Sequence, residues 1–433
     1  MKLSIVNARL VDPASGLDLA AGPGSAIHVA DGRIAALGAA PDGFTAERTL
    51  DASGCVVAPG LLDLAARLRE PGYEYKASLE SEIQAALAGG ITGVACPPDT
   101  EPTLDEPGLI EMLRHRARGI DGSRLFPVGS LTLGLRGESI TEMAELAEAG
   151  CVGFSQALAP IHDTQVLMRA MQYARTYGFT VWLHPQDPHL ARGGVAHAGA
   201  YATQLGLPGI PVIAETVALN TIFDLMRVTG CRVHLCRLSS ADGIELVRHA
   251  RAEGLPVSCD VAVHHLHLID ADIGFFDSNY RVDPPFRAER DRAAIRTGLA
   301  DGTIDAICSD HTPVDDDAKQ LPFGEAEPGV TGLELLLPLT LKWAAETGLS
   351  LIEALARITT GPAAVLGTPE AGGRIAVGDA ADLCVFDPEQ RWVASRTTLF
   401  SQGAHSPYVG HELAGRVRYT LVGGRLAWTL TGA

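Results

Sequence analysis

The chain has 433 residues, enough for one large domain and a smaller one. Its formal charge of −18 argues against nucleic acid and anionic membranes as partners, because both require a basic surface. The eight cysteines form no Cys-x-x-Cys pair, and there is neither a bilayer-spanning apolar run nor a signal-peptide pattern, so we expect a cytoplasmic protein with reduced thiols.

Both ends of the chain carry short strands of alternating polarity. They are predicted at residues 4–10, 26–29, 31–34, 55–57, 381–386, 418–422 and 425–429. Because these two flanks enclose a middle of different texture, we expect one small β-sandwich domain assembled from residues 1–57 and 366–433.

The middle, residues 58–365, alternates short apolar runs with segments of helical periodicity. Strands are predicted at residues 60–65, 92–96, 125–128, 151–155, 180–184, 232–236, 257–261 and 305–308. Helices are predicted at residues 78–88, 140–149, 163–177, 241–253 and 290–300. Eight strand-then-helix units predict an α/β fold, a parallel (β/α)8 TIM barrel, with its chemistry where the strands end.

Three motifs in the second half of the chain point to one family. They are Val282-Asp283-Pro284-Pro285-Phe286-Arg287, Asp301-Gly302-Thr303-Ile304-Asp305 and Ser309-Asp310-His311-Thr312-Pro313. With these motifs the chain resembles the dihydroorotases, in particular their long type I branch within the amidohydrolase superfamily, over essentially its whole length. Flanking signals such as Asp31-Gly32-Arg33-Ile34 also occur in hydantoinases and allantoinases, so they indicate only the superfamily.

The resemblance implies one or two zinc ions at the barrel rim, which polarise a cyclic amide and generate hydroxide. Six positions of this chain match the family's site: Ala65, Arg67, Gln156, His184, Arg237 and Asp310. Only His184 and Asp310, the latter matching the catalytic aspartate, keep a ligand-type side chain. Catalytic zinc usually has three protein ligands. We therefore expect no bound metal and a vestigial role for Asp310.

Two of the former ligand positions carry arginine, which stays protonated and offers no lone pair. We hypothesise that Arg67 and Arg237 replace the charge of the metal by pairing with Asp310 and also with Asp63. The alternative is that both arginines point into solvent.

Substrate recognition is altered as well. The resemblance implies that Arg69 matches the arginine that binds the substrate carboxylate. Asp99 stands where the family has an asparagine that assists it. We expect Asp99 to pair with Arg69 and close this anion site. Asn279 and His264 match positions at which the family contacts the pyrimidine ring of the substrate, although a structural role is the simpler interpretation. The segment 264–267 (His-His-x-His) is expected to be extended, with neighbouring side chains on opposite faces, which argues against a metal cluster.

Three functions follow as hypotheses. The resemblance favours a noncatalytic dihydroorotase-like chain, dimers of which hold together the catalytic trimers of aspartate transcarbamoylase in pyrimidine biosynthesis. The second is an active cyclic amidohydrolase whose rearranged metal site combines His184 and Asp310 with His264, His311 or Asp187. The third is a small-molecule binding protein that reuses the closed cleft.

Overall fold

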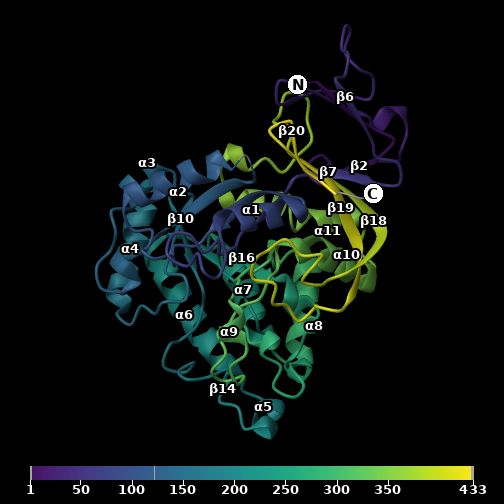
Figure 1. Cartoon of the computed structure of the whole chain (residues 1–433). Coiled ribbons are helices and arrows are strands. Elements are labelled where there is room, and N and C mark those ends of the chain that lie inside the picture. Colours follow the sequence, from purple (N-terminus) through teal and green to yellow (C-terminus); the bar gives the residue numbers. More distant parts are fainter. Residues whose placement is uncertain (1, 121, 431–433) are drawn as a thin grey trace.

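The computed structural model describes residues 2–120 and 122–430. Figure 1 shows a large body of mixed helices and strands, with a smaller body of strands at one end. The first strands of the chain (purple) and the last (yellow) lie side by side in the smaller body. None of the helices in the described part of the chain is long and apolar enough to cross a membrane.

Eight parallel strands form the nearly closed barrel of the large body, as the sequence predicts. They are, in chain and sheet order, β8 (Leu61–Asp63), β9 (Ile91–Cys96), β10 (Arg124–Ser130), β11 (Gly153–Ser155), β12 (Thr180–Leu183), β15 (Arg232–Leu235), β16 (Val257–Ala262) and β17 (Ala306–Cys308). Between the first and last strands, the backbone N–H and the hydroxyl of Ser309 donate to the Asp63 carboxylate, and Ala66 and His311 form a parallel bridge. These contacts close the barrel where no regular ladder runs.

Helices alternate with the barrel strands. They are α1 (Leu79–Ala88), α2 (Pro107–Gly119), α3 (Met143–Ala149), α4 (Thr164–Tyr177), α6 (Val212–Thr229), α7 (Ala241–Ala252), α8 (Glu289–Ala300), α10 (Leu336–Thr347), α11 (Leu351–Ala356) and α12 (Thr360–Leu366). Helix α1 begins where the Ser78 hydroxyl accepts a hydrogen bond from the backbone of Ser81, and it buries Ile83 and Leu87. The five helices predicted from periodicity are all present, with small differences at their ends.

Two sheets make up the smaller body. One has the order β5-β4-β1-β6, and the other β20-β19-β18-β7-β2-β3. Their bounds are β1 (Leu3–Val6), β2 (Arg9–Asp12), β3 (Leu17–Leu19), β4 (Ile27–Ala30), β5 (Arg33–Leu37), β6 (Arg48–Asp51), β7 (Val56–Pro59), β18 (Leu383–Val393), β19 (Glu412–Val422) and β20 (Arg425–Thr429). Apolar side chains of both sheets, among them Ile5 and Val385, share one core.

The single strand predicted at residues 4–10 is wrong. Asn7 adopts a left-handed backbone conformation with φ of 65°, which ends β1 and starts β2 in the other sheet. Asparagine tolerates this conformation better than most residues. Strand β7 pairs with β18, so the N-terminal and C-terminal flanks share one sheet. The domain boundaries drawn at residues 57 and 365 stay predictions.

Candidate functional site

The loops that follow the barrel strands hold side chains at the barrel mouth through unusual backbone angles. Arg69, Ala157, Arg237 and Asp310, which follow four different strands, have φ between 48° and 64°. A left-handed conformation costs an L-residue with a Cβ roughly 1–2 kcal/mol. Such strain is typical of functional sites. The mouth therefore keeps the strained backbone of a site even though several of its side chains differ from the family pattern.

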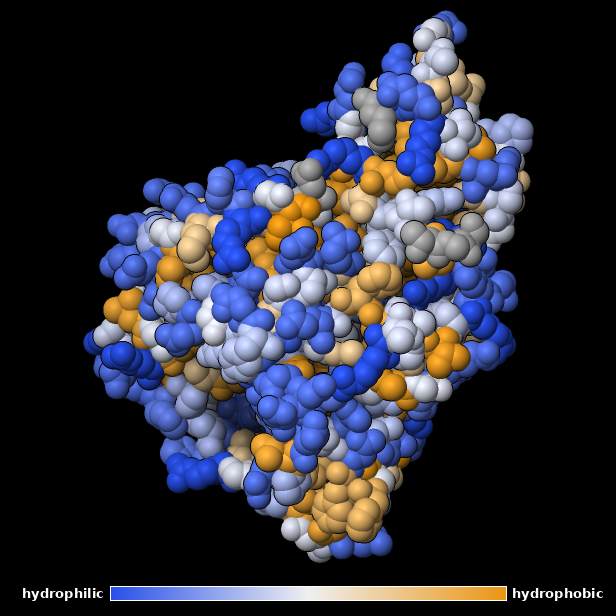
Figure 2. Space-filling model, in the orientation of Figure 1, coloured by the Kyte–Doolittle hydropathy of each residue, from blue (hydrophilic) through white to orange (hydrophobic). Residues whose placement is uncertain are grey.

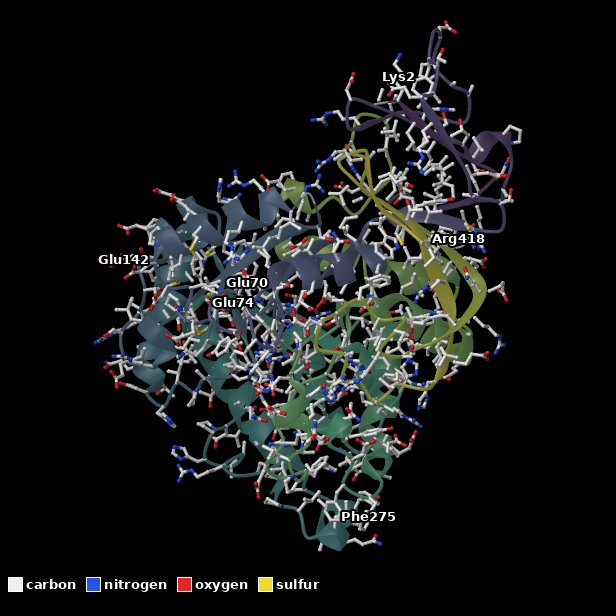
Figure 3. The ribbon with its side chains drawn as sticks, in the orientation of Figure 1. Lys2, Glu70, Glu74, Glu142, Phe275 and Arg418 are labelled. Atoms are coloured by element: carbon white, nitrogen blue, oxygen red, sulfur yellow. The ribbon has the colours of Figure 1, made fainter. Side chains whose placement is uncertain are left out.

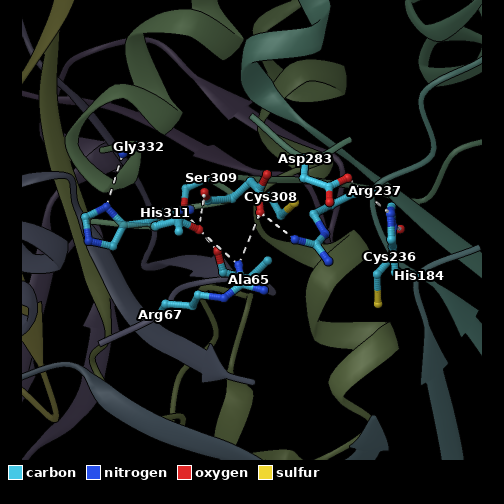
Figure 4. A network of polar contacts seen from close by, with 12 residues as sticks. Ala65, Arg67, His184, Cys236, Arg237, Asp283, Cys308, Ser309, His311 and Gly332 are labelled. Carbon is cyan, nitrogen blue, oxygen red and sulfur yellow. Dashed lines mark hydrogen bonds and ion pairs between the residues drawn. The ribbon is translucent and has the colours of Figure 1, made fainter. Parts of the chain in front are cut away.

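The centre of the mouth is an ion pair between Arg237 and Asp310. The NH1 group of Arg237 donates to Oδ1 of Asp310 at 2.9 Å, and their side chains are 5% and 7% exposed. The backbone N–H of Arg237 donates to Asp260 at 2.7 Å, which fixes the loop that carries the guanidinium. Burial by itself lowers the pKa of Arg237, but the surrounding groups, with the Asp310 carboxylate first among them, together raise this pKa well above its usual value. Figure 4 shows the Arg237 guanidinium directed toward the segment around Cys308 and Ser309.

Arg67 extends this network. Its Nε donates to Oδ2 of Asp99 at 2.7 Å, its NH1 donates to the Thr312 hydroxyl at 2.9 Å, and NH1 lies 3.8 Å from Oδ1 of Asp310. Burial raises the pKa of Asp99, but the charge and hydrogen bond of Arg67, together with the charges of Arg69 and Arg237, hold this pKa below its usual range. Because the Arg67 side chain is only 8% exposed, the solvent-pointing alternative is wrong for it, as it is for Arg237.

Two expected partnerships at the mouth are wrong. Asp99 accepts from Arg67 rather than from Arg69. The buried Arg69 guanidinium has other partners, because its Nε donates to the carbonyl of Pro313 at 2.8 Å and its NH2 lies 3.7 Å from Glu327. Asp63 pairs with neither Arg67 nor Arg237, since both of its carboxylate oxygens accept from Ser309 in the barrel closure.

The other positions that match the family's metal site by resemblance lie around this network. Ala65 has no donor atom. Both ends of the Gln156 amide are engaged, because Oε1 accepts from Thr132 at 2.9 Å and Nε2 donates to the Leu135 carbonyl at 2.9 Å. His184 donates through Nδ1 to the carbonyl of Cys236 at 3.2 Å, which leaves a lone pair on Nε2.

His184 is held neutral. Burial, followed by the positive charge of Arg237, lowers the pKa of His184 to about 4. Its Nε2 has no hydrogen-bond partner, although Oδ1 of Asp283 lies 3.9 Å away. Of the six positions matched by resemblance, His184 therefore supplies the one free nitrogen lone pair.

These residues do not fit a catalytic zinc ion. Ala65 offers no ligand atom, Gln156 is engaged elsewhere, and two positions hold buried guanidinium groups that repel a cation. His184 and Asp310 remain, and Asp310 already accepts from Arg237. Three protein ligands are the usual requirement.

A second group of metal-binding residue types lies next to the mouth. Ligand atoms of His234, Cys236 and Asp260 lie within 4.8 Å of one another. However, the nitrogens of His234 contact the Ser258 hydroxyl and Oδ2 of Asp260, each at 2.9 Å. Burial raises the pKa of Cys236 well above its usual value, so this residue stays a thiol. The group is a satisfied hydrogen-bond network rather than an open set of ligands.

The space at the mouth is small. A cavity of about 30 Å³ lies there, lined in part by Ala65, Arg67, His184 and Arg237. This volume suits one or two water molecules and not a six-membered ring. A larger cavity of about 360 Å³ lies beside it, between the loops that carry Gln156 and His184. The guanidinium groups therefore border only a small cavity at the mouth, and the larger cavity lies to one side.

Two predicted recognition residues are absent from the lining of the mouth cavity. Asn279 contacts Asp277 and His405. His264 is buried and stacks on Tyr408 at 5.7 Å between ring centroids. The extended conformation expected around His264 is wrong, because residues Val263–Leu266 form a 3-10 helix, η3.

Sequence reasoning missed several residues that build the mouth. Asp260 anchors the Arg237 loop, Thr312 holds Arg67, and Asp283 lies near His184. Asp283 and Thr312 belong to the family motifs and could have been found there. Asp260 lies inside a strand, where nothing in the sequence marks it.

Comparisons with known proteins agree with this architecture. A sequence model of the family described as Dihydro-orotase-like matches residues 54–243. A protein of Pseudomonas aeruginosa PAO1 named "Dihydroorotase-like protein" is 48% identical over 426 residues, which cover 98% of this chain and 99% of the relative. The chain belongs to the dihydroorotase-like family. This dihydroorotase-like chain is also 38% identical, over 431 residues and 100% of both sequences, to a "Dihydroorotase" of Syntrophotalea carbinolica.

Solved structures share the fold of this dihydroorotase-like chain. The L-hydantoinase (dihydropyrimidinase) of Arthrobacter aurescens superposes with a TM-score of 0.85, at 24% identity, over 99% of this chain and 97% of that enzyme. A D-hydantoinase gives a TM-score of 0.83 at 21% identity, over 99% and 96% of the two chains. The fold is thus that of the cyclic amidohydrolases.

Proposed function

We propose that this chain is a noncatalytic dihydroorotase-like protein, an assembly partner of the catalytic chain of aspartate transcarbamoylase in pyrimidine biosynthesis. The observation that carries the proposal is the buried ion pair of Arg237 with Asp310 at 2.9 Å. By resemblance, Asp310 is the residue that moves a proton, and Arg237 stands at a zinc-ligand position. Burial raises the pKa of Asp310, although the charges of Arg237 and Arg67 lower it. The Oδ1 of Asp310 already accepts from Arg237, and a proton taken up by this carboxylate would leave the buried cation without its partner.

The scaffold supports a structural role. The barrel is closed by side chains of Asp63 and Ser309, and its core is packed with fully buried groups such as Phe154 and Trp343. In a protein that keeps this framework but has guanidinium groups at the barrel mouth, the outer surface is what remains available for function, through contacts with a partner. The name "Dihydroorotase-like protein" of the Pseudomonas relatives accords with this proposal. We propose further that dimers of this chain hold transcarbamoylase trimers together.

Co-expression of the chain with the transcarbamoylase catalytic chain tests the proposal. We expect the two chains to elute together in size-exclusion chromatography, with a mass from light scattering that requires both. The same fractions should turn over aspartate and carbamoyl phosphate but not dihydroorotate. Separate elution at micromolar concentrations of both chains contradicts the assembly role.

The alternative, an active cyclic amidohydrolase with a rearranged metal site, draws support from the free Nε2 of His184 and from relatives named "Dihydroorotase". It requires a third ligand. His311 is engaged, because one ring nitrogen lies 2.6 Å from Glu82 and the other accepts from Gly332 at 3.1 Å. Asp187 accepts through Oδ1 from two backbone N–H groups of its own loop. Hydrolysis of dihydroorotate by the purified chain after addition of zinc would favour this alternative.

A further inference from the structure

A projecting tip lies at the end of the barrel body farthest from the β-sandwich. Two segments build it, residues 198–209, which include α5 (Ala200–Leu205), and residues 270–280. Figure 1 shows α5 at this end, Figure 3 labels Phe275 there, and Figure 2 shows hydrophobic residues gathered on the same place. Phe275 is 92% exposed, and Phe276 beside it is 36% exposed. A large aromatic ring this exposed is unusual in a folded protein, since burial of apolar area is favourable.

The turn that carries the two exposed rings has defined contacts with the rest of the fold. The two rings meet edge to face with centroids 5.2 Å apart, and the Tyr201 hydroxyl donates to the carbonyl of Gly274 at 2.9 Å. Beneath the turn, Ile273 is buried in a small apolar cluster. Phe276 itself has a φ of 60°, which is a strained conformation for a bulky side chain. The fold therefore bears strain at a place where it presents phenylalanine to the outside.

The charges of the tip indicate what it can contact. Its two segments contain three aspartates, Asp270, Asp272 and Asp277, and neither lysine nor arginine. Asp272 and Asp277 are exposed and accept from nearby backbone N–H groups. The charge of Lys319 reaches Asp277, but this lysine is buried and donates to the carbonyls of Ser278 and Arg281. Two copies of such a tip repel each other, whereas a basic surface attracts it.

We propose that the Phe275–Phe276 tip docks into an apolar pocket bordered by lysine or arginine on a different protein. This inference rests on the proposed function, which makes that protein the catalytic chain of aspartate transcarbamoylase. Rigid aromatic side chains are the usual anchors of protein interfaces, and each buries about 150–250 Å². A standard interface covers about 800 Å² on each partner. The tip is therefore the anchor of a larger contact, with Asp272 and Asp277 guiding its approach.

The test compares three full-length proteins binding to the transcarbamoylase catalytic chain by isothermal titration calorimetry. They are the natural chain, Phe275→Ser, and Val228→Ser as a control at another exposed apolar side chain (73% exposed, in α6). We expect Phe275→Ser to weaken binding at least about tenfold, and Val228→Ser to leave it unchanged. Both variants should keep the melting temperature of the natural chain, because both side chains lie in solvent. Asp272→Lys should also weaken binding, more at low salt than at high salt.

The outcomes separate this inference from the proposed function. If the natural chain binds and Phe275→Ser binds equally well, the tip is not the anchor, while the assembly role stands. If the natural chain does not bind, the proposed function fails and this inference fails with it. If Phe275→Ser dissociates a self-assembly of this chain in light scattering, the occupant is a second copy. Flotation of the natural chain with phosphatidylcholine vesicles, lost in Phe275→Ser, would instead identify a lipid surface. Each of the last two results overturns the inference.

Discussion

The guanidinium of Arg237 and the carboxylate of Asp310 form a hydrogen-bonded ion pair at 2.9 Å. By resemblance, position 237 is that of a metal ligand in the dihydroorotases. Both residues have left-handed backbone angles, and both side chains are almost fully buried. A fixed cation at this point supplies the positive charge that keeps a buried carboxylate paired. It supplies no open coordination position and no lone pair for chemistry.

The ion pair should be necessary for stability. Replacing Arg237 by methionine leaves Asp310 with Arg67 alone, 3.8 Å away, and breaking a buried pair in this way costs about 3–5 kcal/mol. We expect a clear fall in the melting temperature and in the free energy of unfolding measured with urea. Arg290→Met is the matched control, since this arginine is 67% exposed and its pair with Asp242 contributes about 0–1 kcal/mol. Equal unfolding curves for R237M and the natural chain would contradict the role of the pair.

Restoring the ligand set should restore metal binding. The quadruple variant Ala65→His, Arg67→His, Gln156→Asp and Arg237→His removes both guanidinium groups and adds four ligand side chains to His184 and Asp310. Because the strained backbone of the mouth is still present, we expect about one zinc ion per chain. Zinc content is measured by mass spectrometry after dialysis. If a folded variant fails to retain zinc, the loops no longer hold these side chains so that they converge on one metal ion.

The protein should lose stability on acidification at pH values above those at which most carboxylates become protonated. Burial lowers the pKa of His184, His265 and His267 to about 4 and that of His264 to about 3, whereas unfolded histidine has a pKa near 6.5. Between these values the unfolded chain binds more protons than the folded chain, so stability falls as the pH decreases from 6.5 toward 4. Each histidine contributes a slope of up to about 1.4 kcal/mol per pH unit.

Urea unfolding at pH 7.5, 6.0 and 5.0 measures this slope. The variant His264→Phe keeps a ring that can stack on Tyr408 and removes one titrating group, so its slope should be smaller by about one proton. A free energy of unfolding that stays constant from pH 7.5 to 5.0 would mean that these histidines are protonated in the folded state.

Glu334 should have the opposite effect on stability. Burial raises the pKa of Glu334 to about 8, so the folded chain holds a proton there that the unfolded chain loses above pH 4.5. Its contribution to stability therefore decreases as the pH rises from 4.5 to 8. In Glu334→Gln, the amide oxygen can still accept from the backbone of Phe400 without this penalty. We expect the variant to melt above the natural chain at pH 8 and close to it at pH 5. A lower melting temperature at pH 8 would contradict the assignment.

The sequence predicts the barrel well, because its eight apolar runs and intervening helices are local patterns that the fold uses directly. The sandwich is predicted less accurately, since the break between β1 and β2 depends on one left-handed residue, Asn7. Periodicity over residues 4–10 is the same whether the run forms one strand or two. Which sheet each half joins is decided by tertiary pairing.

At the candidate site, the sequence identifies the positions but not all of the partners. The pairing of Arg237 with Asp310 follows from opposite charges at two strand ends, and the structure shows it. The choice of Arg67 over Arg69 as the partner of Asp99 does not follow, because it depends on the contacts of Arg69 with Pro313 and Glu327. The engagement of Asp63 in barrel closure likewise depends on how β8 and β17 meet.

The zinc content of the purified natural chain tests the central claim most directly. The chain is produced with zinc supplied, freed of loosely bound metal by dialysis, and analysed by mass spectrometry, with dihydroorotate hydrolysis measured on the same sample. A mouth closed by guanidinium groups predicts less than about a tenth of an equivalent of zinc and no hydrolysis. One or two tightly bound equivalents together with turnover of dihydroorotate would contradict it, and would make this chain an enzyme whose metal ligands are not the residues identified at the mouth.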